Sequence, residues 1–284
     1  MAAFALRTEL NYTTYCDKEP CGLGMAEPTT TITDFILAAE LLVIAGVMLF
    51  HNLSIISILW SLAWVLLAIA FLCGAINHGF AREVRCSDRD QYCLRYDIYW
   101  ILALLPQCYG IALMFVQSVF LIIKPLKKQF QLLLWGIFFA IAFIYTLSVI
   151  IAIIVGAKFV LEFQFGAFFH LPCVLGALVF FSLPVCCRYR RQSTENKKLS
   201  HASILALTGW IVCIASFVWQ VSGIGFHKHF NHNDIFHVIV MIGFGIFAAG
   251  VIPLVVARAR EDKEQSTVAP VEYATNYDEY HSKL

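Results

Sequence analysis

The sequence predicts an all-α, polytopic membrane protein with seven transmembrane helices. Hydrophobic residues make up 60% of the 284-residue chain, and charged residues make up only 14%. A soluble domain has about 45–50% apolar and roughly 25% charged residues. This chain therefore has too little charge to cover its apolar surface in water. The same figures exclude a disordered chain, and a net charge of +1 does not indicate nucleic-acid binding.

Long windows without Asp, Glu, Lys or Arg locate the helices. A bilayer core about 30 Å thick requires roughly 20 apolar residues per helix. The first window, residues 41–81, is too long for one helix, and the polar run His51-Asn52-Leu53-Ser54 divides it. Seven helices are then expected at about 34–51, 55–79, 97–123, 130–156, 165–187, 200–223 and 234–257.

These limits divide the chain into three parts. Residues 1–33 form an N-terminal segment, residues 34–257 form the seven-helix domain, and residues 258–284 form a polar tail that is expected to be disordered. Without the last residues of the tail, eleven Lys and Arg residues lie after the third, fifth and seventh helices, whereas eight lie on the opposite side. Because basic residues favour the cytosolic side, the tail is expected in the cytosol and the N-terminal segment outside or in a lumen.

Four cysteines fall on the expected non-cytosolic side, where an oxidising compartment permits disulfides. The simplest pairs are Cys86 with Cys93 and Cys16 with Cys21. The alternative is that all four thiols are free.

Further sequence signals bear on the compartment. Asn11-Tyr12-Thr13 fits a glycosylation acceptor, with Asn11 as the modified residue unless the motif is unused. Residues 1–30 lack the apolar stretch of a signal peptide, so the first helix is expected to direct insertion. We expect an integral membrane protein of the secretory pathway or plasma membrane. The C-terminal Ser282-Lys283-Leu284 also reads as a peroxisomal address, but such tags mainly direct soluble matrix proteins.

Ionisable side chains gather at the non-cytosolic helix ends, although polar residues inside a membrane are costly. On the last expected helix, Asp234 and His237 are three residues apart and Asn233 and His237 are four apart, so each pair shares a helix face. The other members at this membrane level are Asp34, His78, Asp97 and His170. Helix capping by Asp34 and Asp234 and interhelical hydrogen bonds of the histidines are the alternatives to a functional site.

The functional interpretation of this cluster is a zinc site. A catalytic zinc ion has three protein ligands and a water molecule; the expected ligands here are His78, Asp97 and His237. Asp234 would be an extra ligand or the general base, and Asn233 would orient a water molecule or a substrate carbonyl. Asp34 and His170 would hold the ligands in position without binding the metal themselves. The expected substrate is an amide or ester of a membrane lipid, because a zinc-bound water can attack such a carbonyl.

This arrangement resembles the CREST superfamily of seven-helix membrane proteins, which includes alkaline ceramidases and progestin and adipoQ receptors. Its members have Ser-x-x-x-His on the second helix, Asp on the third and His-x-x-x-His on the seventh. His78, Asp97 and His237 stand at matching positions here, whereas Gly74 replaces the serine and Asn233 replaces the first histidine. The resemblance implies metal-dependent hydrolysis of a lipid amide by a divergent branch of the superfamily.

Two other classes remain open. A non-enzymatic seven-helix receptor, or a structural membrane protein with a degenerate metal site, fits the same topology. A rhodopsin-type receptor is disfavoured because the third helix ends in Ile123-Lys124-Pro125 without an Asp/Glu-Arg-Tyr motif. A haem electron carrier would need histidines at both membrane faces, and His51 and His201 are available at the cytosolic face.

Overall fold

The computed structural model describes residues 28–79, 94–123, 128–155, 172–182, 194–222 and 232–281. Within these ranges the chain forms seven helices and no strand, which confirms the all-α prediction. The long helices are α2 (Pro28–His51), α3 (Ile55–Gly79), α4 (Leu94–Ile122), α5 (Lys128–Val155), α7 (Thr194–Ser222) and α8 (His232–His281). A short helix, Pro172–Ser182, lies between α5 and α7 in the sequence.

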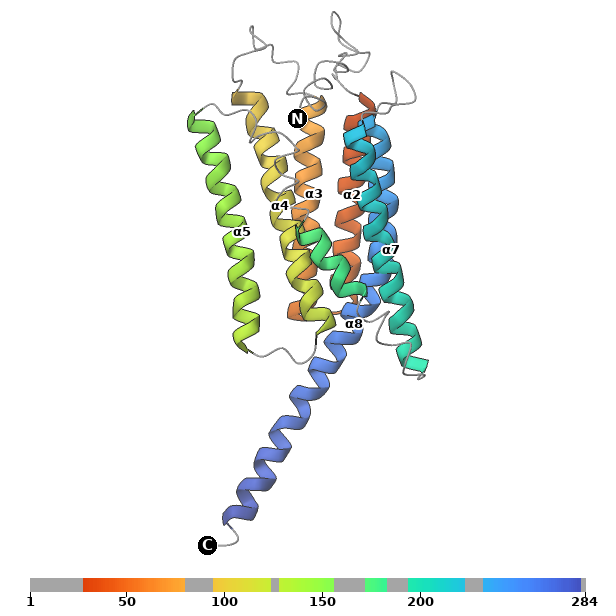
Figure 1. The fold of residues 1–284 in the computed structure, drawn as a ribbon. Helices are drawn as coiled ribbons and strands as arrows, with labels where there is room; N and C mark the ends of the chain where they lie inside the picture. Colours follow the sequence, from red (N-terminus) through yellow and green to blue (C-terminus); the bar gives the residue numbers. More distant parts are fainter. Residues whose placement is uncertain are drawn as a thin grey trace, which may run out of the picture.

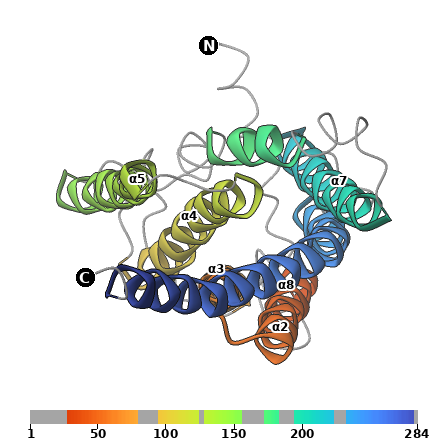
Figure 2. The same ribbon diagram turned by 90° about the horizontal axis from the view of Figure 1, so that it is seen from below.

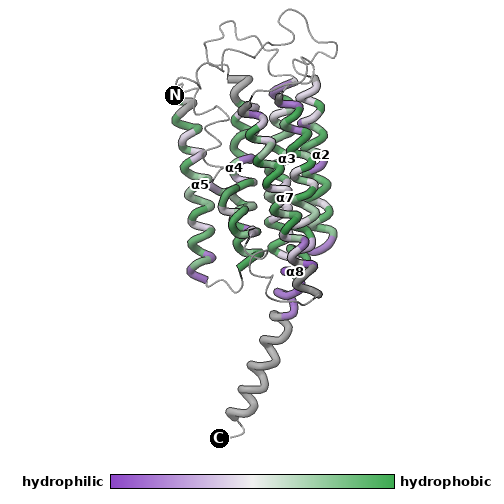
Figure 3. The backbone as a smooth tube through the Cα atoms, turned by 45° about the vertical axis from the view of Figure 1, so that its right-hand side comes forward, coloured by the Kyte–Doolittle hydropathy of each residue, from purple (hydrophilic) through white to green (hydrophobic). Residues whose placement is uncertain are grey.

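Among the described segments, six helices are long and apolar enough to cross a membrane, so the chain is an integral membrane protein. Figure 3 shows apolar residues along the middle of these helices and hydrophilic residues near several of their ends. A fifth membrane helix is expected over 165–187. The structure describes a helix there only over Pro172–Ser182, which is shorter than the roughly 20 residues that a bilayer core requires.

The helices alternate in direction through the bundle (Figure 1). The N-terminal ends of α2, α4 and α8 therefore meet the C-terminal ends of α3, α5 and α7 at one end of the bundle, at the top of Figure 1, which we call the site end. Extensive packing joins α7 to α8, α2 to α3 and α3 to α4, and α2 also contacts α8. Helix α5 packs against α4 and stands at the periphery (Figure 2).

Aromatic rings fill the centre of the bundle. Phe247 of α8 is fully buried. Its ring centroid lies 5.0 Å from that of Trp210, 5.7 Å from those of Trp64 and Phe181, and 5.9 Å from that of Trp60. Tilted and edge-on contacts at such separations are favourable beyond the area they bury. This cluster fixes α3, α7, α8 and the short helix relative to one another.

Helix α2 begins at Pro28, six residues before the expected start at residue 34. Proline suits the first helical turn because its missing N–H would have no partner there. The hydroxyl of Thr33 donates to the carbonyl oxygen of Thr30 at 3.0 Å, so this polar group is satisfied inside the helix. The threonine run therefore continues the helix.

Helix α8 also differs from the expectation, because it continues to His281 where a disordered tail is expected from residue 258 (Figure 1). Arg258 lies 3.8 Å from Glu261 and 3.2 Å from Asp262, at helical spacings of three and four residues. Such pairs stabilise an exposed helix modestly without any buried face. The polarity of this segment is therefore compatible with helix as well as with disorder.

Several predicted features lie outside the described residues: the disulfide pairs Cys16–Cys21 and Cys86–Cys93, the glycosylation acceptor Asn11, His170, and the C-terminal tripeptide 282–284. The described cysteines, Cys73, Cys108, Cys173 and Cys213, are free thiols.

The charge distribution gives a testable orientation for this bundle. A protease-sensitive tag inserted within residues 223–231 is expected to be cleaved from the non-cytosolic side of sealed membranes, because the charge distribution predicts that the site end faces that side. A tag after residue 284 should be cleaved only from the cytosolic side. Cleavage of both tags from one side, or the reverse pattern, would contradict the assigned orientation.

Candidate functional site

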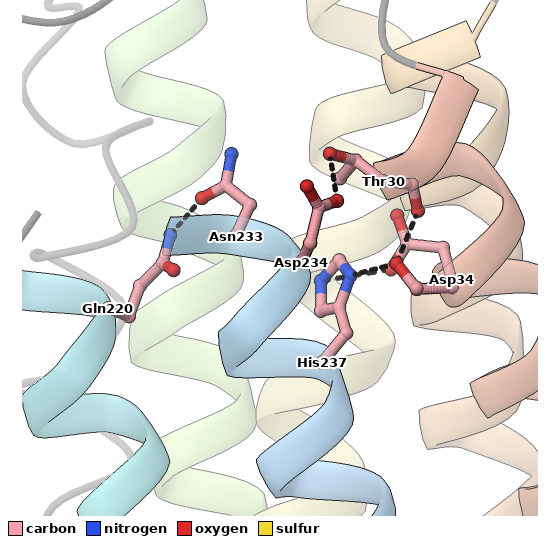
Figure 4. Close-up of polar contacts among 7 residues, drawn as sticks. Thr30, Asp34, Gln220, Asn233, Asp234 and His237 are labelled. Carbon is pink, nitrogen blue, oxygen red and sulfur yellow. Dashed lines mark hydrogen bonds and ion pairs between the residues drawn. The ribbon is translucent and has the colours of Figure 1, made fainter. Parts of the chain in front are cut away.

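The first turns of α2 and α8 lie side by side at the site end and exchange three side-chain contacts (Figure 4). Thr30 Oγ1 donates a hydrogen bond to Asp234 Oδ1 at 2.8 Å. Thr33 Oγ1 lies 3.0 Å from His237 Nδ1, and Asp34 Oδ1 lies 3.1 Å from His237 Nε2. All five residues are buried. Two helices far apart in the sequence are thus joined by polar contacts inside the bundle.

His237 has both ring nitrogens in contact with α2. Two aromatic side chains also flank the imidazole, with ring centroids 6.0 Å away for Phe71 of α3 and 5.3 Å away for its neighbour Phe236. Contacts on this many sides fix both the position and the rotation of the imidazole ring. Such fixed geometry is what a metal ligand or an acid–base residue requires.

His78, in the last turn of α3, supplies a second imidazole at the same end. It lies within electrostatic reach of the Asp34 and Asp234 carboxylates. Its ring makes an edge contact with Trp100 of α4, with centroids 6.3 Å apart. Three helices therefore bring two carboxylates and two imidazoles together, as their positions near the helix ends predict.

One carboxylate oxygen of this cluster has no hydrogen-bond partner among the residues that the structure describes. Asp34 Oδ2 is buried and makes no hydrogen bond in the described part of the chain. Gly74 of α3 faces it, and a Cβ at residue 74 would lie 3.3 Å from this oxygen. Leaving a buried charged oxygen unsatisfied is costly. Glycine at residue 74 thus leaves room beside an oxygen that can accept a proton or bind a cation.

The structure separates Asn233 from this cluster. Its Oδ1 accepts a hydrogen bond from Gln220 Nε2 of α7, and Figure 4 shows it directed away from Asp234 and His237. Adjacent residues point about 100° apart around a helix, which explains why Asn233 meets α7 while Asp234 meets α2. The sequence-based role of Asn233, orienting a water molecule or a substrate carbonyl, stays a prediction.

Asp97 lies in the first turn of α4, at the site end. Its side chain is outside the part of α4 whose side chains the structure describes. Among the side chains that the structure describes, no group of three or more His, Cys, Asp or Glu residues is arranged to hold a metal ion. In the described part, Asp34 and His237 form a close carboxylate–imidazole pair, and a second imidazole, His78, lies within electrostatic reach of Asp34.

Comparison with known proteins identifies a family. No curated protein and no solved structure matches the chain. A family model matches residues 29–255, which include the paired first turns of α2 and α8 and the end of α3. This match does not bear on the resemblance to the CREST superfamily. The chain belongs to the family of unknown function DUF6962.

Proposed function

We propose that this integral membrane protein is a hydrolase that binds one zinc ion at the site end and cleaves an amide or ester bond of a membrane lipid. The observation that carries the proposal is the buried contact between Asp34 Oδ1 and His237 Nε2 at 3.1 Å, beside His78 and Asp234. Ionisable groups inside a membrane bundle usually mark a functional site, because burying them is costly.

The Asp34–His237 pair has the spacing of two ligands on one ion. Zinc binds carboxylate oxygen and imidazole nitrogen at about 2.0–2.2 Å in tetrahedral geometry, which separates two ligand atoms by about 3.3 Å. The observed 3.1 Å is close to that separation. His78, which interacts electrostatically with Asp34, is our candidate for a third ligand, and Asp97 is the candidate from α4. The free Oδ2 of Asp34 adds another oxygen to this donor set.

The residues around this pair can support hydrolysis. A bound zinc ion polarises a carbonyl and lowers the pKa of its water to about 7. Asp234 is our candidate general base, because Thr30 holds its carboxylate beside the pair. A general base must lie within hydrogen-bond reach of the proton it abstracts, and Asp234 lies on the same face of α8 as His237.

Membrane lipid is the proposed substrate class because the site lies one helix away from the lipid. On α2, the side chains of Ile32, Phe35 and Ile36 alternate with the buried site residues and are 47%, 39% and 52% exposed. Large apolar side chains with such exposure in a membrane bundle face acyl chains. A lipid lying along α2 would place its headgroup linkage at the level of Asp34, near the end of the helix.

The test is hydrolysis by the purified protein with zinc in lipid nanodiscs that contain N-acyl and O-acyl lipids. Wild type is expected to release fatty acid. Asp34→Asn should reduce the rate by about 100-fold or more, because loss of a group that only supports a ligand already costs about 10- to 100-fold and Asp34 is proposed to bind the metal itself. Glu40→Gln is the matched control, since Glu40 is the other carboxylate on α2 and lies against Gly245 of α8. Equal rates for wild type and Asp34→Asn, or no release by wild type, would contradict the proposal.

A second candidate function is structural. The polar contacts would act as a clamp that joins α2 to α8 without a metal, in a receptor or structural membrane protein. The observation in its favour is that both nitrogens of His237 and one oxygen of Asp234 already have partners on α2. A clamp predicts no hydrolysis and no zinc, together with a lower unfolding temperature for Thr30→Val. The hydrolysis and zinc measurements therefore separate the two candidates.

A further inference from the structure

The hydroxyl hydrogen of Thr33 already has a hydrogen-bond acceptor. Thr33 Oγ1 donates to the carbonyl oxygen of Thr30 at 3.0 Å, and a carbonyl can only accept. A hydroxyl has one hydrogen and two lone pairs, so toward His237 this oxygen is left to accept. The contact of 3.0 Å between Thr33 Oγ1 and His237 Nδ1 is then a hydrogen bond donated by Nδ1–H.

We infer that Thr33 is a positioning residue that selects the tautomer of His237, placing the ring proton on Nδ1 and the lone pair of the neutral ring on Nε2. The two nitrogens of a histidine are distinct, and the hydrogen bond of one sets the protonation of the other. Nε2 is the atom that faces Asp34. The tautomer follows from the hydrogen bonds alone, whereas its use in binding zinc depends on the proposed function.

This tautomer is the one that a histidine needs to bind a metal through Nε2. Ligating histidines donate their other N–H to an oxygen, which fixes the ring and raises its basicity. With the proton on Nδ1, a lone pair of Nε2 and an oxygen of Asp34 face each other at 3.1 Å. Two buried acceptors at that distance require a cation between them or, in zinc-free protein, a proton carried by the Asp34 carboxyl group. Thr33 thereby prepares the Asp34–His237 pair to bind a cation, although Thr33 itself would not contact the cation.

The local backbone makes Thr33 suited to this role. Thr30 and Thr33 are three residues apart on the first turns of α2, and both are buried against α8. A β-branched side chain has few χ1 rotamers in a helix, and a helical threonine can bond its hydroxyl to a carbonyl of the preceding turn. The same helix turn that starts α2 thus fixes the direction of the Thr33 lone pairs.

The test reads the tautomer directly. In zinc-free protein labelled with ¹⁵N-histidine, the His237 signals are identified by their loss in His237→Gln. Wild type is expected to show a protonated Nδ1 and an unprotonated Nε2. Thr33→Ser keeps the hydroxyl and should retain this pattern. Thr33→Val keeps the shape and should lose it. Thr146→Val is the control, because Thr146 bonds to Tyr109 between α5 and α4, away from α8.

A second readout is zinc affinity. Thr33→Val should weaken it by about 10- to 100-fold and Thr33→Ser should not, as for other groups that orient a ligand. Protonated Nε2 in wild type, or an unchanged pattern in folded Thr33→Val, would overturn the inference. A Thr33-dependent tautomer in a wild type that binds no zinc would support this inference and defeat the proposed function. The two claims can therefore fail separately.

Discussion

Replacing His237 with glutamine is expected to abolish both zinc binding and lipid hydrolysis. His237 contacts Asp34 through Nε2 and Thr33 through Nδ1, so its loss breaks the pair at ligand spacing and frees the carboxylate. Removing a group that only supports a ligand lowers activity by about 10- to 100-fold, and loss of a ligand itself should exceed that. Fatty-acid release from nanodisc lipid and zinc per chain measure the effect.

His201→Gln is the matched control for this substitution. His201 is exposed and lies in the N-terminal part of α7, and α7 begins at the end of the bundle opposite to the site end. It should leave both quantities unchanged. Retained hydrolysis in His237→Gln would exclude this histidine from the chemistry, whatever its effect on stability.

Replacing Gly250 with alanine is expected to destabilise the bundle by about 3 kcal/mol, at the upper end of the usual effect of overpacking. A Cβ at residue 250 would overlap the backbone nitrogen of Ala206 on α7 and lie 2.5 Å from the backbone oxygen of Ala202. Backbone atoms of a packed helix cannot yield as the end of a flexible side chain can. Close approach of small residues is a general basis for helix association in membranes.

Gly46→Ala provides the control for Gly250→Ala. A Cβ at residue 46 of α2 would have nothing within 4 Å. Alanine should therefore leave the protein unchanged or stabilise it by up to about 1 kcal/mol through its better helix propensity. Thermal unfolding in detergent compares the two variants. Similar shifts for both would show that the contact between α7 and α8 does not limit stability.

Sequence patterning predicted the helices well where charge marks their limits. The expected limits of α3, 55–79, agree with the structure, because polar residues flank that apolar segment on one side and Arg82 follows it on the other. The early start of α2 was missed because a run of threonines before an acidic residue resembles a helix entry. The continuation of α8 was missed because a polar segment without periodic apolar residues gives no signal for an exposed helix.

Part of the site could also be predicted. Asp34, His78, Asp234 and His237 come together because helix ends on the same side of a membrane share one depth. The roles of Thr30 and Thr33 could not be read from the sequence, since no pattern indicates that α2 packs beside α8. Their spacing of three residues, with Asp34 next to Thr33, was the available signal for one polar face. The contact of Asn233 with Gln220 of α7 could not be predicted from its spacing to His237, because spacing along one helix does not show which neighbouring helix a side chain meets.

The most direct measurement of the central claim is the zinc content of the purified wild-type protein by mass spectrometry, after incubation with zinc and removal of the excess. We expect one zinc ion per chain in wild type and none in the double variant His78→Gln/His237→Gln. A wild type that stays free of zinc, with a double variant that unfolds at the wild-type temperature, would contradict the metal site.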